Sequence, residues 1–319
     1  MDPFVSCVCP TYNRNKFLPY LIYMFNYQTY PANRRELIIL DDSDCTDASL
    51  INQEVVSQHN KDNNIKYIYS SERIPLGKKR NMLNKLSKEN KETEYIVCFD
   101  DDDYYPPERI RTSIQKLRGT RSILCGSSLL HIYYVDIKKI YSLGPFGPRH
   151  GTAGTFAYHI SLLENYNYDE SAEKSEERFF LKDYTAPLVQ IDAKKTMLCI
   201  AHSSNTCEKR TVLQNNNIKV SNLKLKDFVK DKFLLKFYEN LNMSEKSVID
   251  PEIYSKHIAK NFIMPDLNKY IGKNMPYDSI LELIREKNTG FSKEAIEYFI
   301  KKHTNVLDVL TTNKIIKNI

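Results

Sequence analysis

The chain has 319 residues, of which 41% are apolar and 11% aromatic, and its net charge is +6 at pH 7. So much apolar surface can offset the entropy lost on ordering, which excludes a largely disordered protein. The charge excess is small for this length, so it suits a small anionic substrate and does not indicate nucleic-acid binding.

Four short runs rich in Ile, Val and Tyr predict buried β-strands in the first half of the chain. They cover residues 4–9, 36–40, 65–70 and 95–99. Helical patterns lie between them, at residues 17–27, 48–60 and 77–89. Strands that alternate with helices predict parallel βαβ units. We therefore expect an α/β fold with a mostly parallel central sheet flanked by helices.

The second half of the chain changes character near residue 220. Residues 122–135, 139–143 and 199–202 predict further strands, and four glycines between residues 144 and 154 predict a loop with close backbone approach. Amphipathic stripes then predict helices at residues 223–241, 251–262, 279–286 and 293–303. We expect an α/β domain over residues 1–220 and a helical C-terminal region over residues 221–319, which packs on that domain or on a second subunit.

Polar side chains follow the first four predicted strands. The residues after the strands are Pro10, Thr11, Tyr12, Asn13 and Arg14, then Asp41 and Asp42, then Glu72 and Arg73, and last Asp100, Asp101, Asp102 and Asp103. Ligands bind parallel sheets at the carboxyl ends of the strands. We therefore expect these side chains to converge on one site.

The last four of these residues, Asp100, Asp101, Asp102 and Asp103, form an acidic run. Adjacent carboxylates repel one another, which destabilises a fold unless a cation neutralises them. Their hard oxygen ligands select Mg²⁺ or Mn²⁺. A solvated acidic loop is the alternative. The position at a strand end, followed by two prolines, favours the metal site.

Two further clusters suit a nucleotide. Lys79 and Arg80 lie at the start of the predicted helix at residues 77–89, where anions are favoured. The segment is not a P-loop, because the early glycine is missing. Asp41 and Asp42 end a strand in an acidic segment where Asp44 or Thr46 could cap the following helix. Alternatively, one carboxylate of the segment binds a base or ribose, as acidic residues do in dinucleotide folds.

The sequence predicts no membrane span and no export signal. No stretch approaches the roughly 18 apolar residues of a span, and the N-terminus lacks a basic segment followed by an apolar core. The seven cysteines form no CxxC pair, so we expect free thiols and no zinc site. These features together predict a cytoplasmic protein.

Four segments together resemble family 2 glycosyltransferases of the GT-A fold, over about residues 4–205. They are VSCVCPTYNR, ELIILDDSDCTD, PLGKKRN and YIVCFDDDDYYPPERI, in the family's order and spacing, although the usual glycine of the DDGS turn is absent. The resemblance implies a Rossmann-like GT-A catalytic domain. It also implies a hexosyl- or N-acetylhexosaminyl-transferase that uses a nucleotide-diphosphate sugar, with UDP preferred. The acceptor would be a hydroxyl of a glycan, a protein or a small molecule.

The same resemblance implies roles for individual residues. Asp100 and Asp102 would form the DxD pair, with Asp102 as the direct ligand of Mn²⁺ or Mg²⁺ and His202 as a further metal contact. Glu177, or its neighbour Glu176, would be the general base of an inverting transfer. The nucleotide sugar would be bound by Pro10, Thr11, Tyr12, Arg14, Asp41, Asp42, Lys79, Arg80, Asp100, Asp101, Gly154 and Thr155.

Two alternatives differ from this hypothesis in class. A sugar nucleotidyltransferase would need a glycine-rich activating loop near its N-terminus, but residues 1–76 contain no glycine. A catalytically inactive module that binds nucleotide sugars or carbohydrates is the other. The acidic run and the adjacent Glu176 and Glu177 argue against it.

Overall fold

The computed structural model describes residues 2–44, 52–57, 60, 62, 64–202, 205, 209–241, 279, 282, 284 and 286. The chain forms two compact units, residues 1–52 with 60–247 and residues 53–59 with 248–319. In the second unit the described residues 53–57, 279, 282, 284 and 286 are helical. The helices predicted at residues 251–262 and 293–303 lie outside the described residues. Within the described part of the chain, no helix is long and apolar enough to cross a membrane.

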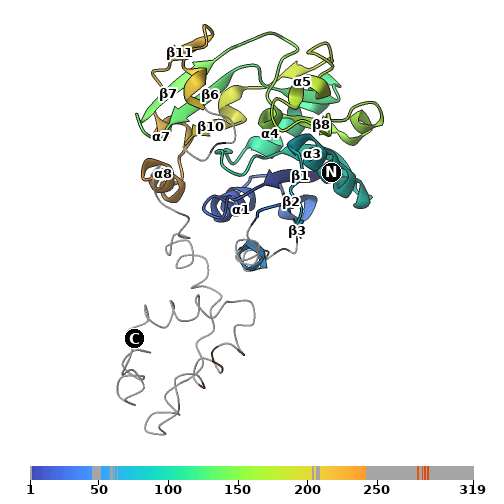
Figure 1. Ribbon diagram of the computed structural model, residues 1–319. Coiled ribbons are helices and arrows are strands. Elements are labelled where there is room, and N and C mark those ends of the chain that lie inside the picture. Colours follow the sequence, from blue (N-terminus) through green and yellow to red (C-terminus); the bar gives the residue numbers. More distant parts are fainter. Residues whose placement is uncertain are drawn as a thin grey trace, which may run out of the picture. The chain divides into compact units, whose positions relative to one another are not determined.

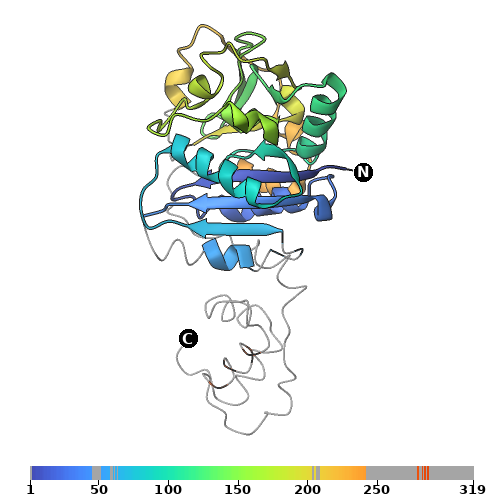
Figure 2. The same ribbon diagram turned by 90° about the vertical axis from the view of Figure 1, so that its right-hand side faces the viewer.

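The first unit is built on a sheet that has seven strands among the described residues (Figure 1). In spatial order they are β3 (Ile65–Tyr69), β2 (Arg35–Asp41), β1 (Phe4–Thr11), β4 (Thr93–Cys98), β8 (Ala157–His159), β5 (Leu124–Gly126) and β9 (Val189–Gln190). The first four are parallel, as predicted, and Figure 2 shows β1, β2 and β3 side by side. Strand β8 runs antiparallel to both of its neighbours.

The register of the parallel strands brings their carboxyl ends to one edge. Thr11 at the end of β1 pairs with Asp41 at the end of β2, and Val8 pairs with Cys98 at the end of β4. The backbone N–H of Phe99 still donates to the carbonyl of Val8, at 2.9 Å. The acidic run, which begins one residue later, therefore lies beside the carboxyl end of β1.

A second sheet carries the strand order β10 (Leu198–Ala201), β6 (Leu130–Tyr134), β7 (Lys139–Leu143) and β11 (Ile218–Val220). The single strand predicted at residues 122–135 is therefore wrong, because β5 and β6 belong to different sheets. Between them, the N–H of Ser127 donates to Thr155 Oγ1 at 2.9 Å and that of Ser128 to Gln190 Oε1 at 2.8 Å. Backbone groups that bond to side chains cannot pair with a neighbouring strand, so the strand breaks there.

Helices cover the sheets and connect the strands. The α-helices are α1 (Leu18–Asn26), α3 (Leu76–Glu89), α4 (Arg109–Thr120), α5 (Glu177–Phe180), α6 (Lys209–Val212), α7 (Leu225–Phe228) and α8 (Lys232–Glu239). Short 3-10 helices are η1 (Ala32–Arg34), η2 (Ala153–Thr155), η3 (Ile160–Glu164) and η4 (Ala193–Lys195). The single helix predicted at residues 223–241 is two helices, because Asp231 caps a new start by accepting from the N–H groups of Phe233 and Leu234.

Helix α8 packs on helix α1 although their sequences lie far apart. The rings of Tyr20 and Phe237 stack with 3.5 Å between centroids, and Phe17 meets the same Phe237 ring at 5.9 Å. The hydroxyl of Tyr238 donates to the backbone carbonyl of Asp103, at 3.3 Å. Residues that the sequence assigned to a separate helical region thus belong to the sheet's own unit and touch the acidic run.

We expect Phe237→Ala to lower the free energy of unfolding of the first unit by about 3 kcal/mol, the scale for truncating a buried aromatic side chain. Phe237 is 8% exposed. In a unit of this size, that loss lowers the melting temperature by about 6–12 °C. Lys232→Ala, an exposed position on the same helix, is the control. If both variants melt like the wild type, α8 is an independent appendix.

The described cysteines are buried in this core. Cys7, Cys9, Cys98, Cys125 and Cys199 are free thiols.

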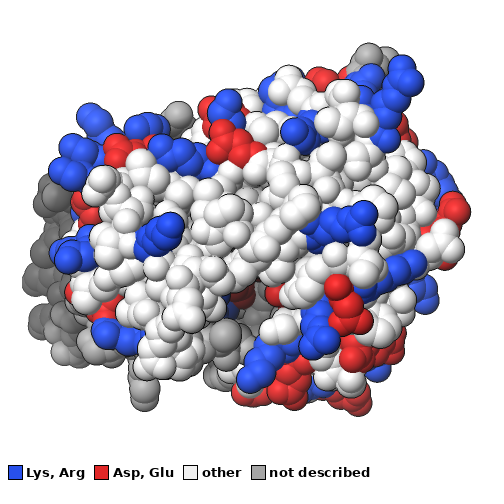
Figure 3. All heavy atoms as spheres, turned by 90° about the horizontal axis from the view of Figure 1, so that it is seen from above, with Lys and Arg blue, Asp and Glu red and all other residues white. Residues whose placement is uncertain are grey.

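Figure 3 views the molecule from above, where the second sheet lies. The centre of that face is largely uncharged, and charged side chains gather toward its edges. The described residues on this face therefore form no continuous basic patch.

Candidate active site

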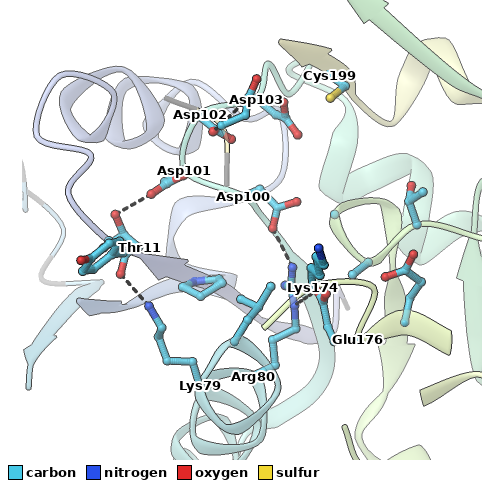
Figure 4. A pocket seen from close by; sticks show the side chains of 18 of the residues that line it. Thr11, Lys79, Arg80, Asp100, Asp101, Asp102, Asp103, Lys174, Glu176 and Cys199 are labelled. Carbon is cyan, nitrogen blue, oxygen red and sulfur yellow. Dashed lines mark hydrogen bonds and ion pairs between the residues drawn. The ribbon is translucent and has the colours of Figure 1, made fainter. Parts of the chain in front are cut away.

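A cavity of about 290 Å³ opens at the carboxyl edge of the main sheet (Figure 4). Twelve of the residues predicted from the sequence line it: Pro10, Thr11, Tyr12, Arg14, Lys79, Arg80, Asp100, Asp101, Asp102, Gly154, Glu176 and Glu177. They come from β1, α3, the segment after β4, η2 and the start of α5. Residues separated by up to 167 positions in the sequence are thus brought to one hollow, as the rule for parallel sheets predicts.

The four carboxylates of the acidic run have different surroundings. Asp101 accepts a 2.6 Å hydrogen bond from Thr11 Oγ1. Asp103 points into the fold, where it is 5% exposed and accepts from the N–H of Ile200 at 2.8 Å. Arg14 Nε lies 3.9 Å from Asp101 Oδ1, whereas Asp100 and Asp102 have cationic or ring-nitrogen partners at 3.4 Å or less. The DxD pair thus differs physically from its two neighbours.

Asp102 lies in a cluster of nitrogen groups. Its Oδ2 is 3.1 Å from His202 Nε2, 3.2 Å from Asn205 Nδ2 and 3.4 Å from Arg14 Nε. Burial opposes ionisation, but the hydrogen bond and charge of His202, followed by the charge of Arg14, hold the pKa of Asp102 well below its usual range. Asp102 is therefore a stable anion at neutral pH.

Asp101 and Asp103, the other buried carboxylates of the run, have raised pKa values. Burial, followed by the charge of Asp102, raises the pKa of Asp101 to about 7. The same two causes raise the pKa of Asp103 well above its ordinary value. Such shifts mean that a further cation near the run would stabilise the fold.

A divalent cation fits this cavity only with help from a substrate. Within the described part of the chain, no three His, Cys, Asp or Glu side chains form a complete metal cage. Mg²⁺ usually takes one or two protein carboxylates and completes its shell with phosphate oxygens and water. Asp100 and Asp102 supply that number of carboxylates. The residues present therefore fit a cation that binds together with a diphosphate.

Gly154 gives the Asp100 carboxylate its place. A Cβ at this position would collide with Asp100 Oδ2 and lie 2.9 Å from Met197 Sδ. The carbonyl of Gly154 is held from behind by Arg109, whose Nη2 also donates to the carbonyl of Phe156 at 2.9 Å. The wall beneath the acidic run is thus rigid.

We expect Arg109→Leu to lower the free energy of unfolding by about 3 kcal/mol, because it removes the buried hydrogen bonds that Arg109 donates to the carbonyls of Gly154 and Phe156 and to Ser113 Oγ. Arg109 is fully buried, and its Nη1 donates to Ser113 Oγ at 2.6 Å. Arg118→Leu, at an exposed position on the same helix, should change stability by less than about 0.5 kcal/mol. Urea unfolding of the three proteins measures the difference, and equal midpoints would contradict the assignment.

Arg80 joins the acidic run to the acidic segment before α5 (Figure 4). Its Nη2 is 2.9 Å from Asp100 Oδ1, and its Nε is 2.6 Å from Glu176 Oε1. Arg80 and Glu176 are both buried, at 4% exposure. Glu176 is therefore held in an ion pair with Arg80. The third nitrogen of the Arg80 guanidinium, Nη1, has no partner among the described residues.

Glu177 differs from Glu176 in its surroundings. It lines the cavity from the first residue of α5, and no ion pair with a described residue engages it. Burial, followed by the charge of Glu176, raises the pKa of Glu177 to about 7. Helix α5 is a single turn of four residues, and burial is the largest cause of the raised pKa of Glu177.

A basic and aromatic corner lies at the end of β1. Lys79 donates to the carbonyl of Thr11 at 2.9 Å and pairs with Asp42, which also binds Arg73 at 2.7 Å. The Arg73 guanidinium lies 3.6 Å from the centre of the Tyr12 ring. Asp42 therefore holds two cations at the wall of the cavity.

Four residues for which the family resemblance implied a role do not line the cavity. Asp41 is fully buried and accepts hydrogen bonds from Ser43, Asn52 and Tyr67. Asp42 forms ion pairs with Lys79 and Arg73, which line the cavity, and His202 contacts the carboxylate of Asp102. Thr155 is 1% exposed and donates to the carbonyl of Thr152 at 2.6 Å. Asp41 and Thr155 therefore form hydrogen bonds within the fold and do not face a ligand in the cavity.

Several lining residues were not predicted as site residues. They are Leu76, Leu130, Thr152, Ala153, Glu173, Lys174, Ser175, Met197, Cys199, Asn205 and Lys209. Arg73 and Asp103, which the strand-end rule did predict, also line the cavity. Asn205 follows a strand, so the same rule could have found it. Lys174 and Lys209 lie in segments without a pattern, and only the tertiary structure reveals them.

One protein family and several solved structures are similar to this chain. The family described as Glycosyl transferase family 2 matches residues 6–163. Among solved structures, S. aureus TarS 1-349 in complex with UDP-GlcNAc has a TM-score of 0.50 and 16% identity, over 98% of this chain and 90% of that chain. Mannosyltransferase PcManGT from Pyrobaculum calidifontis, in complex with GDP-Man and Mn²⁺, has 0.48 and 11%, over 100% and 89%. No curated protein matches the chain. At these identities the structural similarity shows the fold alone.

Proposed function

We propose that this chain, a glycosyltransferase that carries a glycosyl transferase family 2 domain on a GT-A fold, moves a sugar from a UDP-sugar to an acceptor hydroxyl with inversion at the anomeric carbon. The proposal includes a requirement for Mn²⁺ or Mg²⁺. The observation that carries it is the continuous cavity wall from Asp102 through Asp100 and Arg80 to Glu176 and Glu177. One wall thus holds groups for a leaving diphosphate and a base for an acceptor.

The donor's base and ribose would lie in the corner between β1 and α3. Tyr12 offers an aromatic face and Thr11 a hydroxyl, while Lys79 and Arg73 supply positive charge. Aromatic rings and guanidinium planes both stack on bases, so this corner suits a nucleotide. The preference for UDP rests on the resemblance to the family and on no contact in this corner.

The donor's diphosphate would lie against the acidic run. Mn²⁺ or Mg²⁺ held by Asp102 and Asp100 would neutralise the negative charge that grows on the departing diphosphate. Arg80 fixes the Asp100 carboxylate from behind, and its buried Nη1 has no partner among the described residues. Arg14 and His202 orient the carboxylate of Asp102.

Glu177 would act as the general base. In an inverting transfer, the acceptor oxygen attacks the anomeric carbon from the side opposite the diphosphate, and the bond to the diphosphate breaks as the new bond forms. The acceptor proton passes to the Glu177 carboxylate. A base with a pKa near the working pH combines a useful ionised fraction with proton affinity, and Glu177 has that pKa. Glu176 cannot share this role while it is paired with Arg80.

Nucleotide sugars should stabilise the protein only when a divalent cation is present. At a ligand concentration of 100 times Kd, binding adds about 2.7 kcal/mol to the stability, or roughly 5–10 °C in melting temperature. A panel of UDP- and GDP-sugars with and without Mn²⁺ measures this by thermal unfolding. Equal stabilisation in a chelator would contradict the metal requirement, and no stabilisation by any nucleotide sugar would contradict the function.

Slow hydrolysis of the donor without acceptor separates an enzyme from an inactive binding module. An enzyme with a general base in its site releases some sugar to water, whereas a module that only binds the donor does not.

We also propose a reducing, cytoplasmic location, because the described cysteines are free thiols buried in the core. No acceptor is assigned beyond its hydroxyl group.

A further inference from the structure

A second cavity, of about 390 Å³, lies along helix α3 and shares no lining residue with the catalytic cavity. Its wall on the helix is formed by Lys78, Asn81, Met82, Asn84, Lys85 and Lys88. Leu163, Tyr166, Asn167 and Glu170, in and after η3, form the opposite wall. Nothing in the proposed transfer reaction uses this cavity.

The positive charges of this cavity lie on one face of the helix. Lys78, Lys85 and Lys88 are seven and three residues apart, which is the spacing of one helical face. All three are exposed, and none is ion-paired with a described residue. Glu170 is the one carboxylate in the lining, so three positive charges face one negative charge. An anion of charge −2 would balance them.

Asn84 is the second, independent feature of the cavity. Its side chain is 5% exposed, and its Oδ1 accepts a 2.6 Å hydrogen bond from the hydroxyl of Tyr158. The amide nitrogen Nδ2 is buried and has no partner among the described residues. In contrast, Asn81 uses both ends of its amide on the backbone of Tyr168. A buried donor without an acceptor is unfavourable, so Asn84 has one amide donor at the wall of the cavity that the described residues leave unsatisfied.

We propose that this α3 cavity is a second binding site, whose ligand carries a phosphate group. A phosphate monoester has a charge of about −1.5 to −2 at pH 7 and three acceptor oxygens, which match the charge balance and the amide and ammonium donors. Lys85 and Lys88 line the same cavity as Asn84 and supply the charge. Met82, Leu163 and Tyr166 give the cavity an apolar wall for the carbon skeleton of the ligand. The same chemistry is met by free phosphate and by a sugar phosphate.

Methionine methyl groups can report on the two cavities separately, because Met82 lines the α3 cavity and Met197 lines the catalytic one. The full chain, labelled with ¹³C at its methionine methyl groups, is titrated with inorganic phosphate, glucose 6-phosphate or acetate. We expect the Met82 signal to shift with a saturating curve for the two phosphates. Tighter binding of glucose 6-phosphate would identify a sugar phosphate as the ligand, and equal binding would identify the phosphate group alone.

Lys85→Ala combined with Lys88→Ala should raise the Kd reported by Met82 at least tenfold and leave the Met197 response unchanged. Lys91→Ala combined with Lys139→Ala removes the same charge at exposed positions elsewhere and should leave both responses unchanged. Asn84→Asp tests the buried donor, and the lysine variants keep the test valid if that variant does not fold. A Met82 signal that stays still, moves equally with acetate, or shifts equally in the lysine and control variants would overturn the proposal. None of these results depends on sugar transfer.

Discussion

Asp102→Asn should reduce sugar transfer by about three orders of magnitude while the protein stays folded. A divalent ion contributes several kcal/mol to the stabilisation of a leaving diphosphate, and each 1.36 kcal/mol is tenfold in rate. The substitution keeps the size of the side chain and its contacts with Asn205 and His202, but removes the negative charge. The nitrogen groups around Asp102 hold its carboxylate ionised, so this charge is fully present in the wild type.

The transfer rate should be measured as a function of Mn²⁺ concentration. In Asp102→Asn we expect both a lower maximum and a shift of the Mn²⁺ dependence to higher concentration. Glu94→Gln is a matched control, because it neutralises an exposed carboxylate on β4, the strand that leads to the acidic run. Removal of the metal by a chelator should lower the wild type to the level of the variant. Wild-type turnover by Asp102→Asn would exclude Asp102 as a metal ligand.

Glu177→Gln should lower turnover about a hundredfold or more and leave the affinity for the donor and Mn²⁺ unchanged. This is the usual scale for the loss of a general base. A base must be ionised to accept a proton, and the pKa of Glu177 is about 7. Below that pH, the wild-type rate should therefore fall about tenfold for each pH unit, and above it the rate should level off.

The pH profile distinguishes the base from a group that only supports the site. In Glu177→Gln the residual rate should lose this dependence near pH 7. Glu176→Gln should keep it, because it breaks the ion pair with Arg80 and weakens the position of Asp100 without removing the base. If Glu176→Gln loses the pH dependence and Glu177→Gln keeps it, the base is Glu176. If neither variant changes turnover, an inverting mechanism with a carboxylate base at this place is wrong.

The parallel sheet and the position of the acidic run could be predicted from the sequence, because each follows from local patterns. Residues 4–9, 36–40 and 95–99 are largely apolar runs, and β1, β2 and β4 form there with ends that differ from the prediction by at most two residues. Ligand sites lie at the carboxyl ends of such strands, so the polar residues after them were expected to converge. Most of them do, in one cavity.

Local patterns failed where a contact across the fold decides the outcome. Residues 122–135 look like one strand, but Thr155 and Gln190 take the N–H groups of Ser127 and Ser128 and break it in two. Residues 223–241 look like one helix of a separate region. The stacking of Phe237 on Tyr20 instead makes α8 part of the catalytic unit. Thr155 and Gln190 cannot be inferred from residues 122–135, and Tyr20 cannot be inferred from residues 223–241.

The sequence by itself determined the chemical character of this protein: a parallel sheet, a run of carboxylates at a strand end, basic residues at a helix start, and two adjacent glutamates. It could not assign a different role to each member of those groups. Asp41 and Asp42 are neighbours in the sequence, as are Glu176 and Glu177, so their local surroundings are nearly the same. The tertiary structure separates them, because it buries Asp41 among hydrogen-bond donors and pairs Glu176 with Arg80. Glu177 lines the cavity with a raised pKa. Burial and charge pairing decide what a carboxylate can do, and both depend on residues far away in the chain.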